Sequence, residues 1–400
     1  MLNSPTFWSF VLLGLAVLRL WTPGSAVRTL LLILLNAAGL HLALGMGTLD
    51  LALTYGSASW VAFWAVLRPE TIHRRPDVAS LLLISPLVVV WSVGKFSASG
   101  GAESLQYLSV LGYSYLLIKS WTLLKDVCDE RLNDVRPHTV FAYLTFFPTH
   151  LAGPMHYFRE FEAALGRPTP IDAERCVDHV FRIVVGLVKI NLLAPLFTPL
   201  SLVALREVDG FSLATLMKAC FAYSFVVYLD FSGYCDVVIS AARLMGIDIP
   251  ENFNAPYLAR NVREFWQRWH ITFTRVLTSY VFIMISRRLN DALGGRPKLV
   301  SALAVLATFL FCGYWHGPTA NFLLWGLYHA VGIIVYDQYR QRTAKARLLA
   351  SRQPPREGLA LWRQRVRHCL DVAATFAFVS LGWMLFVLPI PRLLKGLGLP

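Results

Sequence analysis

A histidine at the centre of a long uncharged stretch is the first residue of this sequence that could do chemistry. The 38 residues between Lys298 and Asp337 contain no Asp, Glu, Lys or Arg, and the motif GYWHGP lies in their middle at 313–318. A glycine and a proline directly after His316 cannot continue a regular helix, and the backbone groups that they free need a protein-lined or wet site. A neutral imidazole in such a site can take a proton from a hydroxyl. We therefore interpret His316 as a catalytic base with Trp315 beside its substrate; the alternative is a histidine that only joins two helices by hydrogen bonds.

A second polar cluster reads RNVREFWQRWHITF at 260–273. One continuous helix would place four polar residues on one face, namely Arg263, Gln267, His270 and Thr274. The aromatic residues gather on another face, so the sequence predicts an amphipathic helix at the membrane interface. In the functional interpretation His270 points into the same cavity as His316, and Arg263, Gln267 and Arg268 hold a phosphate. The alternative is a helix anchored by its aromatic residues, with its arginines at lipid headgroups.

Three further polar positions lie in apolar or turn-rich surroundings. Asp230 and Asp236 need partners such as Arg243, Arg263 or a backbone N–H group, so we favour a structural ion-pair role for them over catalysis. The turn at 249–257 leads into the His270 segment, and we place its Asn252 among the substrate-binding residues. His150 lies in the segment 146–154, whose two prolines and glycine predict a re-entrant segment.

The composition indicates the kind of protein that positions these residues. Of 400 residues, 56% are apolar and 15% are Asp, Glu, Lys or Arg, and the mean hydropathy is +0.52. A soluble chain carries about 25% charged residues, and a membrane helix needs about 20 apolar ones. The numbers exclude a soluble enzyme, a disordered chain and a disulfide scaffold. They predict an all-α integral membrane protein, a polytopic bundle of about 11 or more helices.

The apolar stretches place these helices along one membrane domain over residues 1–400. Candidate spans are 7–21, 29–46, 50–66, 78–96, 105–121, 139–156, 178–203, 211–243, 264–285, 299–337 and 370–390. The stretches 211–243 and 299–337 are too long for one helix and contain charged residues or Gly-Pro, so each is expected to fold as two segments. No basic region precedes the first apolar run, so we expect the first helix to be retained rather than cleaved.

The charge and cysteine patterns indicate which ligands to expect. The net charge of +13 is explained by basic loops at 68–75, 286–298 and 338–368, which we expect to face the cytoplasm and anionic lipid. Nucleic acid is therefore not expected as a partner, and the bilayer is. The six cysteines show no metal-ligand spacing, so no metal is expected.

Taken in order, these segments resemble the membrane-bound O-acyltransferases. Within that family they resemble the bacterial branch of the D-alanyl transfer protein of teichoic-acid modification and the alginate O-acetylase. The matching pieces are 146–154 with 158–161, 228–236, 246–257, 264–272, 314–317 and 380–383. They form a family-like core of about 143–386. The stretch 278–289 lacks the Pro-Leu-Gly-Gly of acetylase-like members, which favours the D-alanyl transfer side.

The resemblance implies a fold of tilted, broken or re-entrant helices around a central tunnel. It implies that His316 is the catalytic histidine and that His270 is its partner, facing it in the tunnel. It also implies a cytoplasmic thioester donor, either a phosphopantetheine carrier or coenzyme A, as substrate, with no bound cofactor. The partners implied are an acyl carrier protein and an extracytoplasmic acyltransferase or esterase-like protein, and the location is the bacterial cytoplasmic (inner) membrane.

Chemistry supports acyl transfer to a hydroxyl, because a thioester is already activated and needs only proton removal and oxyanion stabilisation. We expect His316 to remove the proton, and His270 to orient the thioester or polarise its carbonyl. The acceptor is expected to be a cell-envelope polymer or a partner protein. Three alternatives stay open. They are an acetyl-coenzyme A-dependent polysaccharide O-acetyltransferase, a transporter or flippase that uses Asp230, Asp236 and His316 as a path, and an inactive carrier-recruiting scaffold.

Overall fold

The computed structural model describes residues 2, 4–20, 26–68, 70–98, 112–208, 210–344 and 358–398. Within these ranges the regular structure is helical and no strand occurs, which confirms the predicted all-α class. Among the described residues, six helices are long and apolar enough to cross a membrane: Ala26–Ala43, Pro76–Lys95, Ala173–Leu200, Leu213–Leu244, Pro297–His316 and Leu361–Val387. Residues 105–111 of one predicted span and 345–357 of the predicted basic loop lie outside the described residues.

The chain forms two compact units. The first consists of Met1–Ile190 and Phe231–Glu251, and the second of Asn191–Asp230 and Asn252–Pro400. Helix α11 (Leu213–Leu244) contributes its N-terminal part to the second unit and its C-terminal part to the first. The single membrane domain over residues 1–400 stays a prediction.

The first unit is built from the helices of the N-terminal half of the chain. Its elements are α1 (Pro5–Leu20), α2 (Ala26–Ala38), η1 (Gly39–Ala43), α3 (Thr48–Leu67), α4 (Thr71–Arg74), α5 (Pro76–Ala98), α6 (Tyr113–Cys128), α7 (Pro137–Leu144), η3 (Phe147–Thr149), α8 (Phe158–Gly166) and α9 (Ala173–Val188), with the end of α11. Fully buried aromatic rings form part of its core, where Phe146 packs against Phe147 and Phe161. These rings hold the irregular segment around η3 in place.

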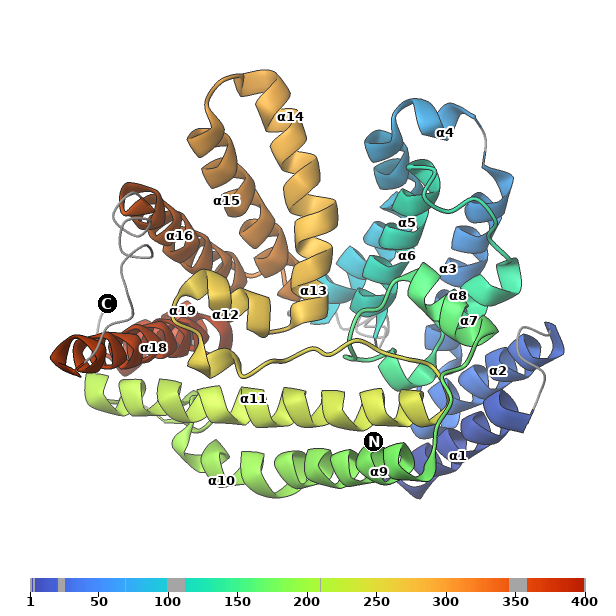
Figure 1. The fold of residues 1–400 in the computed structure, drawn as a ribbon, viewed down its shortest axis with the longest axis horizontal. Helices are drawn as coiled ribbons and strands as arrows, with labels where there is room; N and C mark the ends of the chain where they lie inside the picture. Colours follow the sequence, from blue (N-terminus) through green and yellow to red (C-terminus); the bar gives the residue numbers. More distant parts are fainter. Residues whose placement is uncertain are drawn as a thin grey trace. The chain divides into compact units, whose positions relative to one another are not determined.

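Helix α9 shows why this unit belongs in lipid. It lies beside the C-terminal part of α11 (Figure 1), and Gly186 and Gly233 make the close approach possible, since a Cβ on either would lie 2.7 Å from the other's carbonyl oxygen. Its outer face carries exposed apolar side chains, including Val177 and Phe181, the latter 68% exposed. A row of exposed apolar residues on an apolar helix is a surface for hydrocarbon rather than water.

The second unit contains His316, the His270 segment and Asn252. Its elements are η4 (Lys189–Leu193, shared with the first unit), α10 (Ala194–Phe197), η5 (Thr198–Leu200), η6 (Ala204–Arg206), the start of α11, η7 (Pro256–Leu258), α12 (Val262–Arg268), α13 (Ile271–Val276), η8 (Leu277–Phe282), α14 (Ile283–Leu293), α15 (Pro297–His316), α16 (Ala320–Arg342), α18 (Gly358–Val387) and α19 (Ile390–Gly396). Helices α15 and α16 run side by side (Figure 1). Two glycines allow their backbones to touch. A Cβ on Gly313 would lie 2.2 Å from the Phe322 carbonyl oxygen, and one on Gly326 would lie 2.3 Å from that of Phe309.

The structure confirms one predicted helix break and corrects three spans. The stretch 299–337 does divide at Gly317-Pro318, into α15 and α16. The stretch 211–243 is one helix, α11, because its glycine packs inside a helix contact and its charged residues near the C-terminal end have ion-pair partners. The stretch 139–156 is α7, the short η3 and extended chain rather than one span, since its prolines and glycine interrupt the helix. The stretch 264–285 is broken at His270.

Candidate active site

His316 is the last residue of α15, and the local sequence explains this position. Proline has no N–H group, so the chain leaves the helix at Gly317, whose N–H still donates to the Gly313 carbonyl oxygen at 3.2 Å. Thr319 is extended and α16 begins at Ala320. The imidazole therefore projects from a helix end beside a tight link, and it is only partly buried.

Aromatic rings surround the His316 imidazole within the second unit. Trp315 lies with its ring centroid 4.8 Å away, Phe386 of α18 at 4.9 Å, Trp325 of α16 at 5.4 Å and Phe322 at 6.0 Å. Three helices thus contribute to one enclosure around the ring. The neutral form of an imidazole in this enclosure is the form that can accept a proton.

His270 lies at a break in the chain rather than on one amphipathic helix. Helix α12 ends at Arg268, His270 adopts a left-handed conformation with φ of 45°, and α13 starts at Ile271. A non-glycine residue in that region stores backbone strain, a feature that gathers at functional sites. The continuous helix with one polar stripe is therefore a wrong prediction. The interface helix is wrong too, because Phe265, Trp266, Trp269 and Phe273 are all buried in protein.

Asn252 holds His270 in this conformation. Its side-chain Oδ1 accepts hydrogen bonds from the backbone N–H of Thr272 at 3.3 Å and from the Thr272 hydroxyl at 2.8 Å, and it lies 3.1 Å from Nδ1 of His270. Its backbone carbonyl accepts from the Ile271 N–H at 2.9 Å. Because a backbone N–H can only donate, Oδ1 must be the acceptor throughout, and we assign the proton of neutral His270 to Nδ1. Its Nε2 is then the ring nitrogen that can accept a hydrogen bond.

The two histidines interact within this unit. The pKa of His270 is lowered to about 3, mainly by burial and to a smaller extent by the neighbouring His316. A line of ring contacts also connects them, with the Phe273 centroid 5.1 Å from that of His270 and 4.4 Å from that of Trp315, which adjoins His316. His270 lies outside the six candidate spans and stays neutral at physiological pH. The structure thus brings together His270, Asn252, Trp315 and His316.

Arg263 and Gln267 line a neighbouring cavity of about 200 Å³ between α12, η8, α15 and α16, which also includes Thr274. Arg263 is not free for a ligand in this state, because it makes a two-pronged ion pair with Asp337 of α16, with Nε to Oδ1 at 2.9 Å. A second cavity of about 170 Å³ reaches Asp337 from the end of α15 and α16 that carries Lys298 and Arg342. The ion pair therefore lies between two cavities.

Arg268 does not line either cavity. It donates to Glu264 at 2.8 Å, and Arg260 also pairs with that carboxylate at 3.3 Å. Burial raises the pKa of Glu264. The hydrogen bonds and charge of Arg260 and the charge of Arg268 outweigh this effect, so the pKa lies below its ordinary value. In this structure Arg268 is paired with Glu264 and does not line either cavity that could hold the predicted phosphate.

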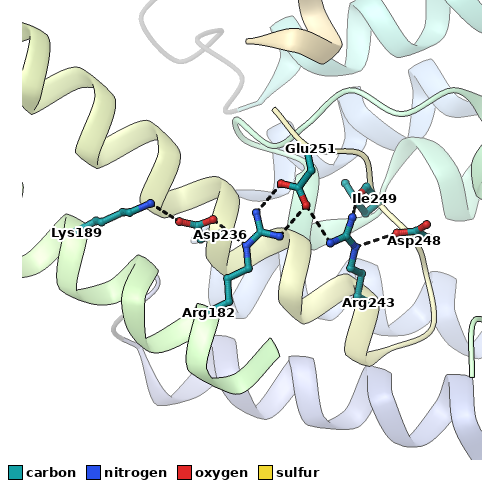
Figure 2. A network of polar contacts seen from close by, with 7 residues as sticks. All are labelled: Arg182, Lys189, Asp236, Arg243, Asp248, Ile249 and Glu251. Atoms are coloured by element: carbon teal, nitrogen blue, oxygen red, sulfur yellow. Dashed lines mark hydrogen bonds and ion pairs between the residues drawn. The ribbon is translucent and has the colours of Figure 1, made fainter. Parts of the chain in front are cut away.

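Asp236 belongs to a charge network of the first unit (Figure 2). It accepts from Arg182 at 2.8 Å and from Lys189 at 2.7 Å, so its partners come from α9 and the start of η4, and the predicted Arg243 is not one of them. Arg182 also donates twice to Glu251, at 2.7 and 2.6 Å. Arg243 donates to Glu251 at 3.0 Å and to Asp248 at 2.9 Å. Three cations meet three carboxylates, an arrangement that fastens α9 to α11 and to the turn after it.

The other two positions of uncertain role, Asp230 and His150, belong to different units. Asp230 lies mid-helix on α11 in the second unit, and neither Arg243 nor Arg263 pairs with it, since both have other partners. His150 is buried in the first unit at the end of η3, and its ring packs against Gly112, where a Cβ would lie 2.6 Å from it.

Sequence reasoning missed two features of the site. Asp337 is the single acidic residue between Asp291 and Glu357, which could have indicated a dedicated partner for an arginine. Phe386, Trp325 and Phe322 around His316 carry no such signal, because single aromatic residues on apolar helices are ordinary core residues. Only the packing of α16 and α18 reveals their role.

Comparisons with known proteins identify a family and several relatives. The sequence model described as "MBOAT, membrane-bound O-acyltransferase family" matches residues 103–356, a range that contains both histidines.

Named relatives point to two kinds of acyl transfer. The chain is 26% identical over 283 residues to a teichoic acid D-alanyltransferase of Bacillus subtilis, covering 70% of this chain and 69% of that protein. It is 29% identical over 247 residues to a peptidoglycan O-acetyltransferase of Helicobacter pylori, covering 61% of this chain but only 42% of that protein. A probable alginate O-acetylase of Pseudomonas aeruginosa is 26% identical over 411 residues, covering 96% of this chain and 72% of that protein.

Proposed function

This chain belongs to the membrane-bound O-acyltransferase family, and from that premise we propose that it moves an acyl group from a cytoplasmic thioester to a hydroxyl of a cell-envelope acceptor or partner protein. The observation that carries the proposal is the pairing of a strained, Asn-held His270 with His316 inside an aromatic enclosure. The relative named as a D-alanyltransferase supports D-alanyl-like transfer as the first form of this reaction.

His316 acts as the general base. Its neutral imidazole takes the proton of the acceptor hydroxyl while the oxygen attacks the thioester carbonyl carbon. The tetrahedral intermediate then collapses, the C–S bond breaks, and the leaving thiolate takes the proton back from the imidazolium. The histidine ends neutral, and the products are an ester and a free thiol. Removal of the hydroxyl proton is the step that needs a base, because the thioester is already activated.

His270 orients rather than polarises in this mechanism. With its proton on Nδ1 towards Asn252, Nε2 of His270 can accept a hydrogen bond but cannot donate one to a carbonyl oxygen. We propose that it accepts the N–H of His316, which leaves the other His316 nitrogen as the base. Asn252 is thus a positioning residue rather than a substrate ligand, and Trp315 forms one wall of the acyl site.

The donor is proposed to reach the histidines from the cytoplasmic side. Lys298 and Arg342 line the cavity of about 170 Å³, and Arg263 and Gln267 line the neighbouring cavity of about 200 Å³. A phosphopantetheine phosphate would therefore meet positive charge along this path. Binding there requires Arg263 to share or exchange its Asp337 contact. The donor carrier would be an acyl carrier protein or coenzyme A. The acceptor would arrive through a tunnel from the outer face of the bacterial inner membrane, and an extracytoplasmic partner protein is the alternative recipient.

A second candidate is acetyl transfer from acetyl-coenzyme A to a polysaccharide, favoured by the relatives named as O-acetyltransferase and O-acetylase. Membranes from cells that express the chain, supplied with labelled acetyl-coenzyme A or with a carrier protein loaded with labelled D-alanine, distinguish the two. Label that enters an ester of the envelope fraction from one donor identifies the reaction. If membranes that contain the His316→Ala variant incorporated as much label as wild-type membranes, His316 could not be the general base.

A further inference from the structure

An open groove of about 830 Å³ runs along the second unit between the start of α12, one face of α16 and α18. Leu327, Val331 and Val335 follow one another at helical spacing along its α16 wall, and their side chains are 39%, 48% and 60% exposed. The volume is in the range of ligand sites, about 300–1,000 Å³. This groove is separate from the two cavities beside Arg263.

The groove has one apolar end and one polar end. Leu324 and Leu385 lie at the first, and Arg260, Tyr339 and Asp371 at the second. From Leu324 to Tyr339 the axis of α16 covers about 22 Å at about 1.5 Å per residue. One leaflet contributes about 15 Å of hydrocarbon, so the groove has the length of a single leaflet and its interface. Its α18 wall belongs to a candidate membrane span, Leu361–Val387.

Positive charge gathers at the polar end. Arg260 lines it with a side chain that is 57% exposed, and Arg367 of α18 donates to the Tyr339 hydroxyl at 3.2 Å across the rim. Arg340, Arg363 and Arg365 are also exposed on the adjoining turns. Asp371 is the opposing carboxylate on the groove wall, and Glu264 takes part of the charge of Arg260. The cations outnumber the carboxylates there.

We propose that this groove binds an anionic phospholipid, with an acyl chain along α16 and α18 and the phosphate near Arg260 and Arg367. The bilayer supplies the occupant, because the apolar wall lies on a candidate membrane span and an amphiphile matches both ends. The charge complementarity selects an anionic headgroup over a zwitterionic one, since each basic residue near a membrane surface favours anionic lipid. This inference goes beyond the acyl-transfer reaction and does not depend on it.

The test is lipid retention by the full chain, purified in mild detergent and incubated with equal phosphatidylglycerol and phosphatidylcholine, then measured by native mass spectrometry. Wild type should retain phosphatidylglycerol in preference. Val331→Trp fills the groove and should reduce phospholipid retention at least tenfold, and Val335→Trp provides a second version of the same block. The matched control is Leu323→Trp, an exposed position on α16 that does not line the groove, which should behave as wild type.

The headgroup contact is tested by Arg260→Gln and Arg367→Gln. Each should lower the preference for phosphatidylglycerol about fivefold while the lipid still binds, and Arg260→Lys should restore it. The wild-type thermal midpoint should rise with added phosphatidylglycerol and that of Val331→Trp should not. Unchanged retention by both tryptophan variants would overturn the lipid site, and equal retention of both lipids by wild type would overturn the headgroup contact. Conversion of a dimer into a monomer by Val331→Trp would assign the groove to a second copy instead.

Discussion

Oδ1 of Asn252 lies 3.1 Å from Nδ1 of His270, at the point where His270 adopts a left-handed backbone conformation. The same oxygen accepts two hydrogen bonds from Thr272. One buried amide therefore sets the conformation of the loop and the tautomer of the histidine together. This relationship turns a sequence motif into a defined arrangement of donors and acceptors.

Loss of the base should be the most severe single change. His316→Ala removes the proton acceptor, and acyl transfer should fall by a factor of about 10² to 10⁴, the usual contribution of a general base. The protein should still insert and purify, because the His316 ring is only partly buried. His368→Ala, at an exposed histidine on α18, should keep wild-type turnover. Label transfer from thioester to hydroxyl measures both variants.

Asn252 should control the pH dependence of the reaction. Asn252→Asp keeps an acceptor opposite Nδ1 but adds a negative charge, which stabilises protonated His270 and raises its pKa from about 3. The acid limb of the pH–rate profile should therefore move to higher pH. Asn252→Ala should instead lower activity at every pH and destabilise the fold by about 1–3 kcal/mol, because buried donors lose their partner. An unshifted profile in the aspartate variant would contradict the positioning role.

Arg263 should contribute to donor binding rather than to the chemical step. We expect Arg263→Ala to raise KM for an acyl-phosphopantetheine donor about tenfold with little change in kcat, since a charge-assisted contact to phosphate is lost. An acyl-pantetheine that lacks the phosphate should show no such difference. Arg268→Ala is the matched control, because Arg268 pairs with Glu264 and lines neither cavity. The same KM change with both donors would contradict a phosphate contact.

The glycine crossing of α15 and α16 should tolerate no side chain. Gly313→Ala places a Cβ 2.2 Å from the Phe322 carbonyl oxygen, so the two helices must separate and His316 must move. We expect a clear fall in the thermal midpoint together with loss of acyl transfer. Gly56→Ala on α3 meets no atom within 4 Å and should be neutral or slightly stabilising. Thermal unfolding in detergent followed by tryptophan fluorescence compares the two.

Glu251 should make stability depend on pH. Burial raises the pKa of the Glu251 carboxyl, but hydrogen bonds and charge from Arg182 and the charge of Arg243 outweigh it, so the pKa lies below its ordinary value. A depressed folded-state pKa gives stability that is complete above the unfolded pKa and is lost as the pH falls through the folded one. Glu251→Gln should therefore lower the unfolding midpoint at pH 7 and differ less from wild type at pH 4. The effect should be about 1 kcal/mol, because the carboxylate is 45% exposed and solvent screens it. Asp172→Asn should show a smaller difference, because the ion pair of this exposed carboxylate with Arg175 is long at 3.7 Å, and asparagine can still accept the cap hydrogen bond from the Arg175 N–H.

The helix break after His316 could be predicted because its cause is local. Proline removes an N–H group wherever it stands, so Gly317-Pro318 ends α15 in any fold. The break at His270 could not be predicted in this way. Nothing in RWHIT forbids a helix, and the interruption depends on Asn252 hydrogen-bonding to Ile271, Thr272 and His270 from a separate loop. A regular helical stripe was therefore the reasonable but wrong expectation.

Residue order alone determined the membrane character, the helical class, the two histidines as candidates and the family resemblance, because these depend on composition, local backbone rules and motif spacing. Tertiary structure decided which aromatic rings surround His316 and that Asp337 forms an ion pair with Arg263. It also decided that Asp236 pairs with Arg182 and Lys189 rather than with Arg243. The physical reason is that hydrogen bonds and ion pairs depend on distances of a few ångströms between residues far apart in the chain. Only the packing of the helices sets those distances.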